Sequence, residues 1–189
     1  KKKSYLTLLF LAVACIATSE LGVAAVYEAS PETYRALLPR LRAGDTLFLA
    51  AGEYRDGLPV HGVSGAPDEP IVIAGPERGP PATFFARPGH NTVSIVDAHH
   101  LVIRNLVLEG NNIAVDAVKA ERQSRAAHHI TLENLTIRGH GNDQQTVGIS
   151  TKCPAWNWVI REVTIVGAGT GMYLGDSDGG APFVAGLIE

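Results

Sequence analysis

Basic side chains lie in or beside the stretches that separate three similar segments of this chain. They are Lys119, Arg122, Arg125, Arg138 and Lys152. An arginine presents a planar fork of N–H groups that matches a carboxylate, so these stretches could hold an acidic ligand. Lysines at strand ends are more often plain solvated surface, and that alternative stays open.

Other side chains in the same stretches could contact a sugar. Trp156 and Tyr173 offer flat faces for a sugar ring, whereas Trp158 falls at an apolar position and is expected in the core. His140, at the head of a Gly-Asn-Asp loop, is grouped with them as a substrate-binding candidate.

Loop carboxylates suggest calcium as a possible cofactor. Asp143, Asp176 and Asp178 supply the oxygen ligands that calcium prefers. The Asp-x-Asp-Gly run lacks the later glutamate and the six to eight ligands of a calcium loop, so turn formation is the alternative.

A single unit occurs three times, at residues 99–110, 128–139 and 156–167. The copies are offset by 29 and 28 residues, which is the spacing of a solenoid coil. Apolar residues alternate in each copy, which predicts two short strands joined at a corner. Asn105 and Asn134 occupy that corner because asparagine tolerates a left-handed backbone, and their amides should form a ladder that Glu162 ends.

Stacked coils should place equivalent residues above one another at about 4.8 Å. The outward column Arg104, Glu133 and Arg161 alternates in charge, as does Glu109 over Arg138. The doubled histidines at 99–100 and 128–129 would also stack. They could bind a metal or relay protons, or simply form a structural turn.

Three segments carry a resemblance to a known family: residues 43–54, 69–76 and 93–110. They resemble the right-handed parallel β-helix proteins, and within these the secreted branch that contains chondroitinase-B-like and alginate-lyase-like polysaccharide lyases. The resemblance implies an all-β solenoid. From the residues themselves, a short helix is expected to close its start, with Ser30 as cap, Pro31 at the first position and one face formed by Tyr34, Leu37, Leu38 and Leu41. Pro39 should end or kink this helix early.

The resemblance also implies a site. In such lyases the glycan lies along a third sheet, here expected at 115–119, 147–152 and 171–174, with Val118, Ile149 and Met172 inward and Lys119, Ser150 and Tyr173 outward. A base removes the proton beside a uronate carboxylate, and a cation offsets the developing charge. Lys119, Lys152 and Arg138 are the catalytic candidates, and Arg122 and Arg125 would bind substrate. The alternative is a non-catalytic adhesion solenoid that binds glycan or protein.

The two ends of the chain predict export and an incomplete coil. Residues 1–25 read as a signal peptide, with basic residues before an apolar run too short to span a bilayer. Lipid attachment at Cys15 is the less favoured alternative. The domain is expected over 26–189, secreted or periplasmic, with its last coil cut short. Cys153 is then its only cysteine, so no internal disulfide can form.

Composition narrows the function further. Hydrophobic residues make up 46% of the 189 residues, with 20 Gly and 11 Pro, as in a turn-rich globular domain. The net charge is −3, and becomes −5 without Lys1–Lys3 and Glu20. General nucleic-acid binding is therefore not expected. The resemblance to polysaccharide lyases implies an acidic polysaccharide as the partner.

Overall fold

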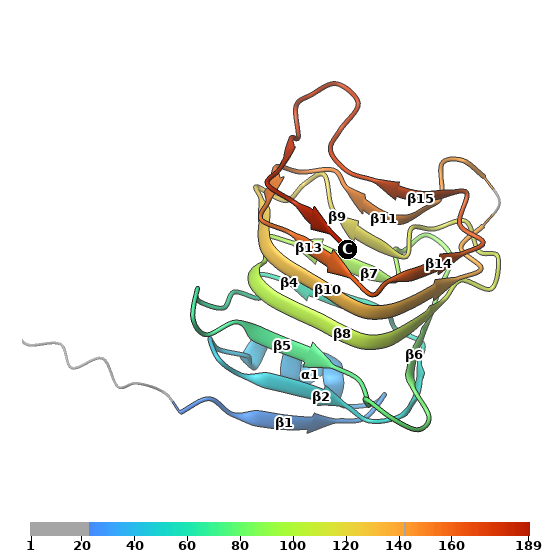
Figure 1. The fold of residues 1–189 in the computed structure, drawn as a ribbon. Helices are drawn as coiled ribbons and strands as arrows, with labels where there is room; N and C mark the ends of the chain where they lie inside the picture. Colours follow the sequence, from blue (N-terminus) through green and yellow to red (C-terminus); the bar gives the residue numbers. More distant parts are fainter. Residues whose placement is uncertain (1–22, 142) are drawn as a thin grey trace, which may run out of the picture.

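The chain winds into a right-handed parallel β-helix, seen in a computed structural model that describes residues 23–141 and 143–189. Figure 1 shows the coils rising from the N-terminal part in blue to the C-terminal part in red. Most of the expected signal segment, with Cys15, lies outside the described residues. Among those residues, no helix has the length and apolar character needed to cross a membrane.

Each coil contributes strands to a large sheet with two arms and to a separate smaller sheet. The strands of the first arm are β1 Val26–Ala29, β2 Thr46–Leu49, β5 Ile71–Ala74, β8 His99–Glu109, β10 Ala127–Arg138, β12 Ala155–Trp156, β13 Val159–Arg161, β16 Phe183–Val184 and β17 Leu187–Ile188. The second arm holds the ends of β8 and β10 with β3 Gly52–Tyr54, β6 Ala82–Phe85 and β14 Thr164–Val166. The smaller sheet, called sheet B, consists of β4 Leu58–His61, β7 Val93–Val96, β9 Val118–Ala120, β11 Val147–Thr151 and β15 Thr170–Tyr173.

Alternation along each strand builds the core. One inward column is formed, coil by coil, by Leu47, Ile73, Ile103, Leu132 and Ile160. All five side chains are buried, because period-two alternation sends every second residue of a strand to the same side. Trp158 is buried as expected, and its Nε1 donates to the carbonyl oxygen of Ala127 at 2.9 Å.

The corners of the large sheet confirm the predicted asparagine ladder. Asn105 and Asn134 have φ of 58° and 48°, in the left-handed region. The Nδ2 group of Asn134 donates to Oδ1 of Asn105 at 2.9 Å. Glu162 keeps the corner with φ of 54° but has no amide to extend the ladder.

The charge columns confirm the register. Glu133 pairs with Arg104 below and Arg161 above, and the Arg161 guanidinium lies 3.2 Å from the Glu133 carboxylate. Arg138 binds Glu109 in the same way. Exposed pairs contribute at most about 1 kcal/mol each, so their main effect is to disfavour a shifted register.

The first coil is covered by a helix that begins later than expected and ends early at Pro39, as expected. Helix α1 spans Tyr34–Leu37 and continues as the 3₁₀ helix η1 over Leu38–Arg40, where Pro39 prevents a longer α-helix. Ser30 does not begin the helix: residues 31–33 form a turn, and α1 starts at Tyr34, whose N–H donates to the Ser30 carbonyl oxygen at 3.1 Å. Tyr34 packs edge-on against Tyr54, with ring centroids 5.1 Å apart, and so closes the end of the core.

Alanine substitutions at neighbouring positions of β10 should distinguish inward-facing from outward-facing side chains by their effect on stability. Leu135→Ala should lower the free energy of unfolding by about 2–5 kcal/mol, because the buried side chain leaves a cavity. Thr136→Ala, one residue along on the outer surface, should change it by less than about 1 kcal/mol. Urea unfolding of the two variants measures this, and equal losses would contradict the assigned faces.

Candidate functional site: a groove on sheet B

The outer face of sheet B carries one outward residue per coil in a continuous column. It runs through Pro59, Ser94, Lys119, Ser150 and Tyr173. Five strands spaced at about 4.8 Å make this face roughly 19 Å long. The predicted outward positions of Lys119, Ser150 and Tyr173 are confirmed.

A first hollow, of about 450 Å³, lies at the early end of this face. Arg35, His61, Arg87, Ser94 and Glu121 line it. The Ser94 hydroxyl donates to Oε1 of Glu121 at 2.9 Å, so the ring Nε2 of His61, 3.0 Å from the same hydroxyl oxygen, is assigned as a donor to it. Burial lowers the pKa of His61, while the nearby Glu121 charge opposes that shift.

A buried carboxylate occupies the middle of the face. The Asp116 side chain is 7% exposed, and its Oδ2 lies 3.0 Å from Nζ of Lys119 and accepts from the Ser150 hydroxyl at 3.0 Å. Its Oδ1 accepts the N–H of Val147, one coil further along, at 2.9 Å. The Asp116 N–H in turn donates to Oδ1 of Asn91 in the coil before, so side chains here join three coils. Lys119 thus offsets a buried negative charge.

A second hollow, of about 430 Å³, lies at the late end of the face. Arg122, Lys152, Tyr173 and Asp176 line it. The Asp176 side chain is 5% exposed, and its carboxylate lies 2.7 Å from Nη2 of Arg122 and 3.8 Å from Nζ of Lys152. The Lys152 ammonium also sits 3.5 Å from the centroid of the Tyr173 ring, a cation–π contact.

These two hollows and the Asp116 region between them are called the sheet B groove. Its cations are Arg35, Arg87, Lys119, Arg122 and Lys152, and its anions are Asp116, Glu121 and Asp176. The Nε of Arg87 is buried and has no hydrogen-bond partner within the described part of the chain. The groove therefore has an excess of positive charge on a chain whose net charge is −3.

Four of the predicted site residues meet in the groove, and four others do not. Lys119, Arg122, Lys152 and Tyr173 line it or lie beside it. The four that lie elsewhere are Arg125, Arg138, His140 and Trp156.

Arg138 ends β10 on the large sheet, bound to Glu109, and Arg125 lies at the bend between the sheets, with its Nε 3.3 Å from the Asp97 carboxylate. His140 is fully buried, with Nδ1 3.1 Å from the carbonyl oxygen of Val115, and burial lowers its pKa. A glycan on the surface does not reach it.

The three aspartates proposed for calcium do not converge. Asp143 and Asp178 each accept a backbone N–H two residues ahead at 2.8 Å, as in local turns. Asp176 is bound by Arg122 and Lys152. Across residues 23–141 and 143–189, one group of three potential metal ligands comes together, and it is formed by histidines.

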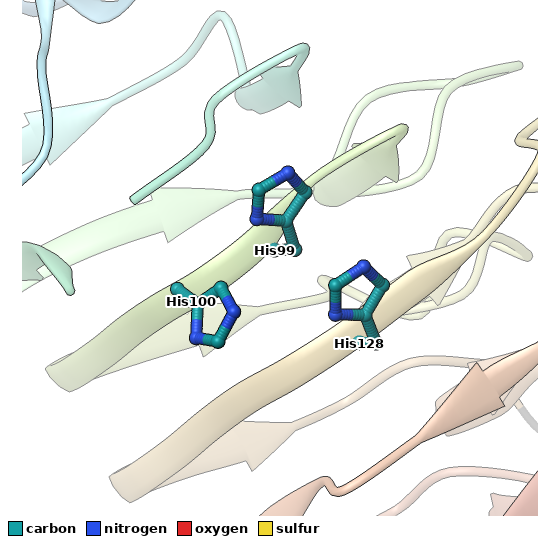
Figure 2. A group of neighbouring side chains, drawn as sticks. All are labelled: His99, His100 and His128. Atoms are coloured by element: carbon teal, nitrogen blue, oxygen red, sulfur yellow. The ribbon is translucent and has the colours of Figure 1, made fainter. Parts of the chain in front are cut away.

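That histidine group lies at the start of the large sheet (Figure 2). The ring of His99 stacks on that of His128 with centroids 4.7 Å apart, and Trp156 continues the stack at 4.3 Å from His128. Burial, then the neighbouring imidazoles, lowers the pKa of His128 to about 4. Trp156, which was expected to offer its face to a sugar ring, instead stacks on the ring of His128.

Sequence reasoning missed the early half of the groove, formed by Arg35, His61, Arg87, Ser94 and Glu121. Residues alternate along β4, with Leu58 and Val60 inward and Pro59 and His61 outward. Extending the alignment of the coils towards the N-terminus would therefore have found His61 and Ser94. Arg35 comes from the cap and Arg87 from the turn after β6, and no repeat marks either residue.

No protein-family model matches the sequence, and no curated protein matches it. Solved structures do match in fold. An alginate lyase from Paenibacillus sp. str. FPU-7 superposes with a TM-score of 0.67 and 18% identity, covering 87% of this chain and 58% of that one. A lacto-N-biosidase of glycoside hydrolase family 136 from Eubacterium ramulus gives 0.66 and 15%, covering 87% and 40%. An alginate lyase of polysaccharide lyase family 6 gives 0.53 and 17%, covering 73% and 21%.

The shared feature is the fold. At these identities the likeness establishes a parallel β-helix and not an activity. The chain spans 58% of the Paenibacillus lyase and 40% of the lacto-N-biosidase, so each of those proteins contains substantial structure beyond the matched part.

Removing the cation from the Asp116 pair should destabilise the fold. Lys119→Met leaves a nearly buried carboxylate uncompensated and should cost about 1–3 kcal/mol, reduced from a fully buried pair because Lys119 is 26% exposed. Lys119→Met combined with Asp116→Asn should lose less than the single variant, since no charge is stranded. Denaturant unfolding of both measures this, and a single variant as stable as the parent would show that the pair contributes nothing.

Proposed function

We propose that this chain binds an acidic polysaccharide along the sheet B groove. The observation that carries the proposal is the line of cationic side chains over successive coils, from Arg35 and Arg87 through Lys119 to Arg122 and Lys152. A linear polymer with a carboxylate on each sugar, laid along the solenoid axis, would meet this line repeatedly. A compact anion would use only one part of it.

The chemistry of the groove suits such a ligand. Arg122 is 68% exposed, so its guanidinium is accessible to a carboxylate although one edge contacts Asp176. Tyr173 is 38% exposed and presents a ring at the late end of the groove for the apolar face of a sugar.

The fold-level analogy points the same way. The superposed proteins are named as alginate lyases and a lacto-N-biosidase, which are enzymes that act on glycans. Together with the basic and apolar residues near the start of the sequence, this supports a role outside the cytoplasm, in the periplasm or beyond the cell.

Neutralising the late half of the groove should weaken binding. Arg122→Gln and Lys152→Gln should each lower alginate affinity about three- to tenfold, as expected for one partly exposed charge contact. Arg161→Gln removes an arginine from the large sheet and should change nothing. Affinity electrophoresis at several salt concentrations measures this. Equal losses in all three variants would indicate a non-specific charge effect.

Uronate elimination is a second candidate function, favoured by the first hollow. There an imidazole, His61, shares a hollow with the cations Arg35 and Arg87. In this reaction a base takes the proton from the carbon that bears the carboxylate. That electron pair forms a double bond to the neighbouring carbon, the bond from this carbon to the glycosidic oxygen breaks, and the oxygen takes up a proton. His61 suits the base because burial lowers its pKa and favours the neutral ring.

His61→Ala should separate elimination from binding. If His61 is the base, turnover of alginate or pectate should fall by at least about a hundredfold with affinity retained within about threefold. Ultraviolet absorbance of the unsaturated uronate product measures turnover, and a melting curve checks that the variant folds. Unchanged turnover would assign the base to another residue, Lys119 or Lys152 included. Glycan binding without turnover in the parent chain would favour a non-catalytic binding solenoid.

A further inference from the structure

Four imidazoles form a two-by-two array where β8 and β10 begin. His99 stacks on His128 with ring centroids 4.7 Å apart, and His100 stacks on His129 at 4.4 Å. Within each coil the two rings meet edge to face, at 5.3 Å and 5.0 Å. No other part of the described chain brings together three side chains that could ligate a metal.

Backbone geometry explains why adjacent residues can both face outward. Successive side chains of a strand normally point to opposite faces, so one histidine of each pair should enter the core. His100 and His129 instead have φ of 49° and 52°, and these left-handed residues redirect the chain before the buried residues Leu101 and Ile130. Non-glycine residues in this region are uncommon, and here the same strain recurs one coil apart.

The ring nitrogens are close enough to share a cation. One nitrogen each of His99, His100 and His128 lies within 4.8 Å of the other two, and Figure 2 shows the three rings around a common space. A tetrahedral zinc ion with N–Zn distances of about 2.0–2.1 Å needs nitrogens about 3.4 Å apart. Binding therefore requires the half-buried rings to rotate about χ2, a broad torsion, out of the parallel stack that His99 and His128 form.

One nitrogen of the array has a polar demand that the protein alone does not meet. The Nδ1 atom of His99 is buried and has no hydrogen-bond partner among the residues described. The Nδ1 atoms of His128 and His129 lie 2.8 Å apart, so one carries a hydrogen and the other a lone pair.

We propose that His99, His100 and His128 bind a late first-row divalent cation of the zinc class. His129 either supplies a fourth nitrogen or holds His128 in place through the contact between their Nδ1 atoms. The Nε2 atom of His129 in turn contacts Nδ2 of Asn157 at 2.8 Å. A half-turn of that amide exchanges its donor for an acceptor, so Asn157 can serve either tautomer of His129. Imidazole nitrogens suit zinc, copper and nickel rather than calcium or magnesium.

A cation in the histidine array would have a structural role, because the array lies on the large sheet and not in the sheet B groove. His99 and His128 belong to adjacent coils, joined in register at these residues. A cation bound to both would therefore clamp two coils together. Because it binds only the folded chain, it should raise the melting temperature.

Zinc binding can be tested with the metal ion alone. The full chain should bind one Zn²⁺ in calorimetry and melt at a higher temperature with it. His128→Gln and His100→Gln should each weaken binding at least about tenfold, the minimum expected for a lost ligand. His90→Ala, an exposed histidine away from the array, is the matched control and should bind as the parent does.

Trp156 provides a local readout. Its ring lies 4.3 Å from that of His128, whereas Trp158, the other tryptophan, is buried. Cu²⁺ should quench Trp156 fluorescence in the parent and in His90→Ala at the same concentration. In His128→Gln, half-maximal quenching should need at least about tenfold more Cu²⁺. Trp156→Phe should lose most of the quenching yet still bind Zn²⁺.

Three results would overturn the proposal: no Zn²⁺ binding by the parent, parent-like binding by folded His100→Gln and His128→Gln, or an equal loss in His90→Ala. A melting curve of each metal-free variant shows whether it is folded.

Discussion

In-register stacking of parallel coils is the constraint on which the rest of this structure depends. Every coil must repeat the same path so that each backbone N–H meets a carbonyl one coil away, and any drift would strand polar groups in the core. Left-handed residues at fixed places make the path repeat. Asn105 and Asn134 turn one corner, and His100 and His129 adjust the entry to the same strands. Charge columns and histidine stacks both follow from that register.

The sequence was informative where one coil could be compared with the next. The repeat of 99–110 in 128–139 predicted the corner, the inward leucines and the charge pairs, because stacking converts a sequence offset into spatial neighbours. Trp158 was placed in the core by the same comparison. Helix α1 was expected to begin at Ser30 and Pro31, but residues 31–33 form a turn, which cap residues alone do not distinguish from a first helical turn.

The candidate site was only half predictable. Lys119, Arg122, Lys152 and Tyr173 lie in the stretches between the repeated segments, where each coil adds a strand to sheet B. Arg35 and Arg87 reach the groove from elements that do not repeat. His140 shows the opposite problem: its loop looked exposed, but the ring is fully buried. Arg138 lies at the end of a repeated strand, and its predicted position over Glu109 is confirmed. It lies on the large sheet, however, and not on sheet B with the groove.

The hydrogen bonds of Asn91 and Asp116 have a consequence for how such a groove can change length. Each of these side chains binds the backbone of the next coil, so the polar floor of the groove is also part of what joins the coils. Losing or gaining single residues there would break the chain of contacts. Duplicating one whole coil would preserve it, adding a strand to sheet B and one more place along the groove. Growth in whole modules is therefore the route that this architecture leaves open for matching longer ligands.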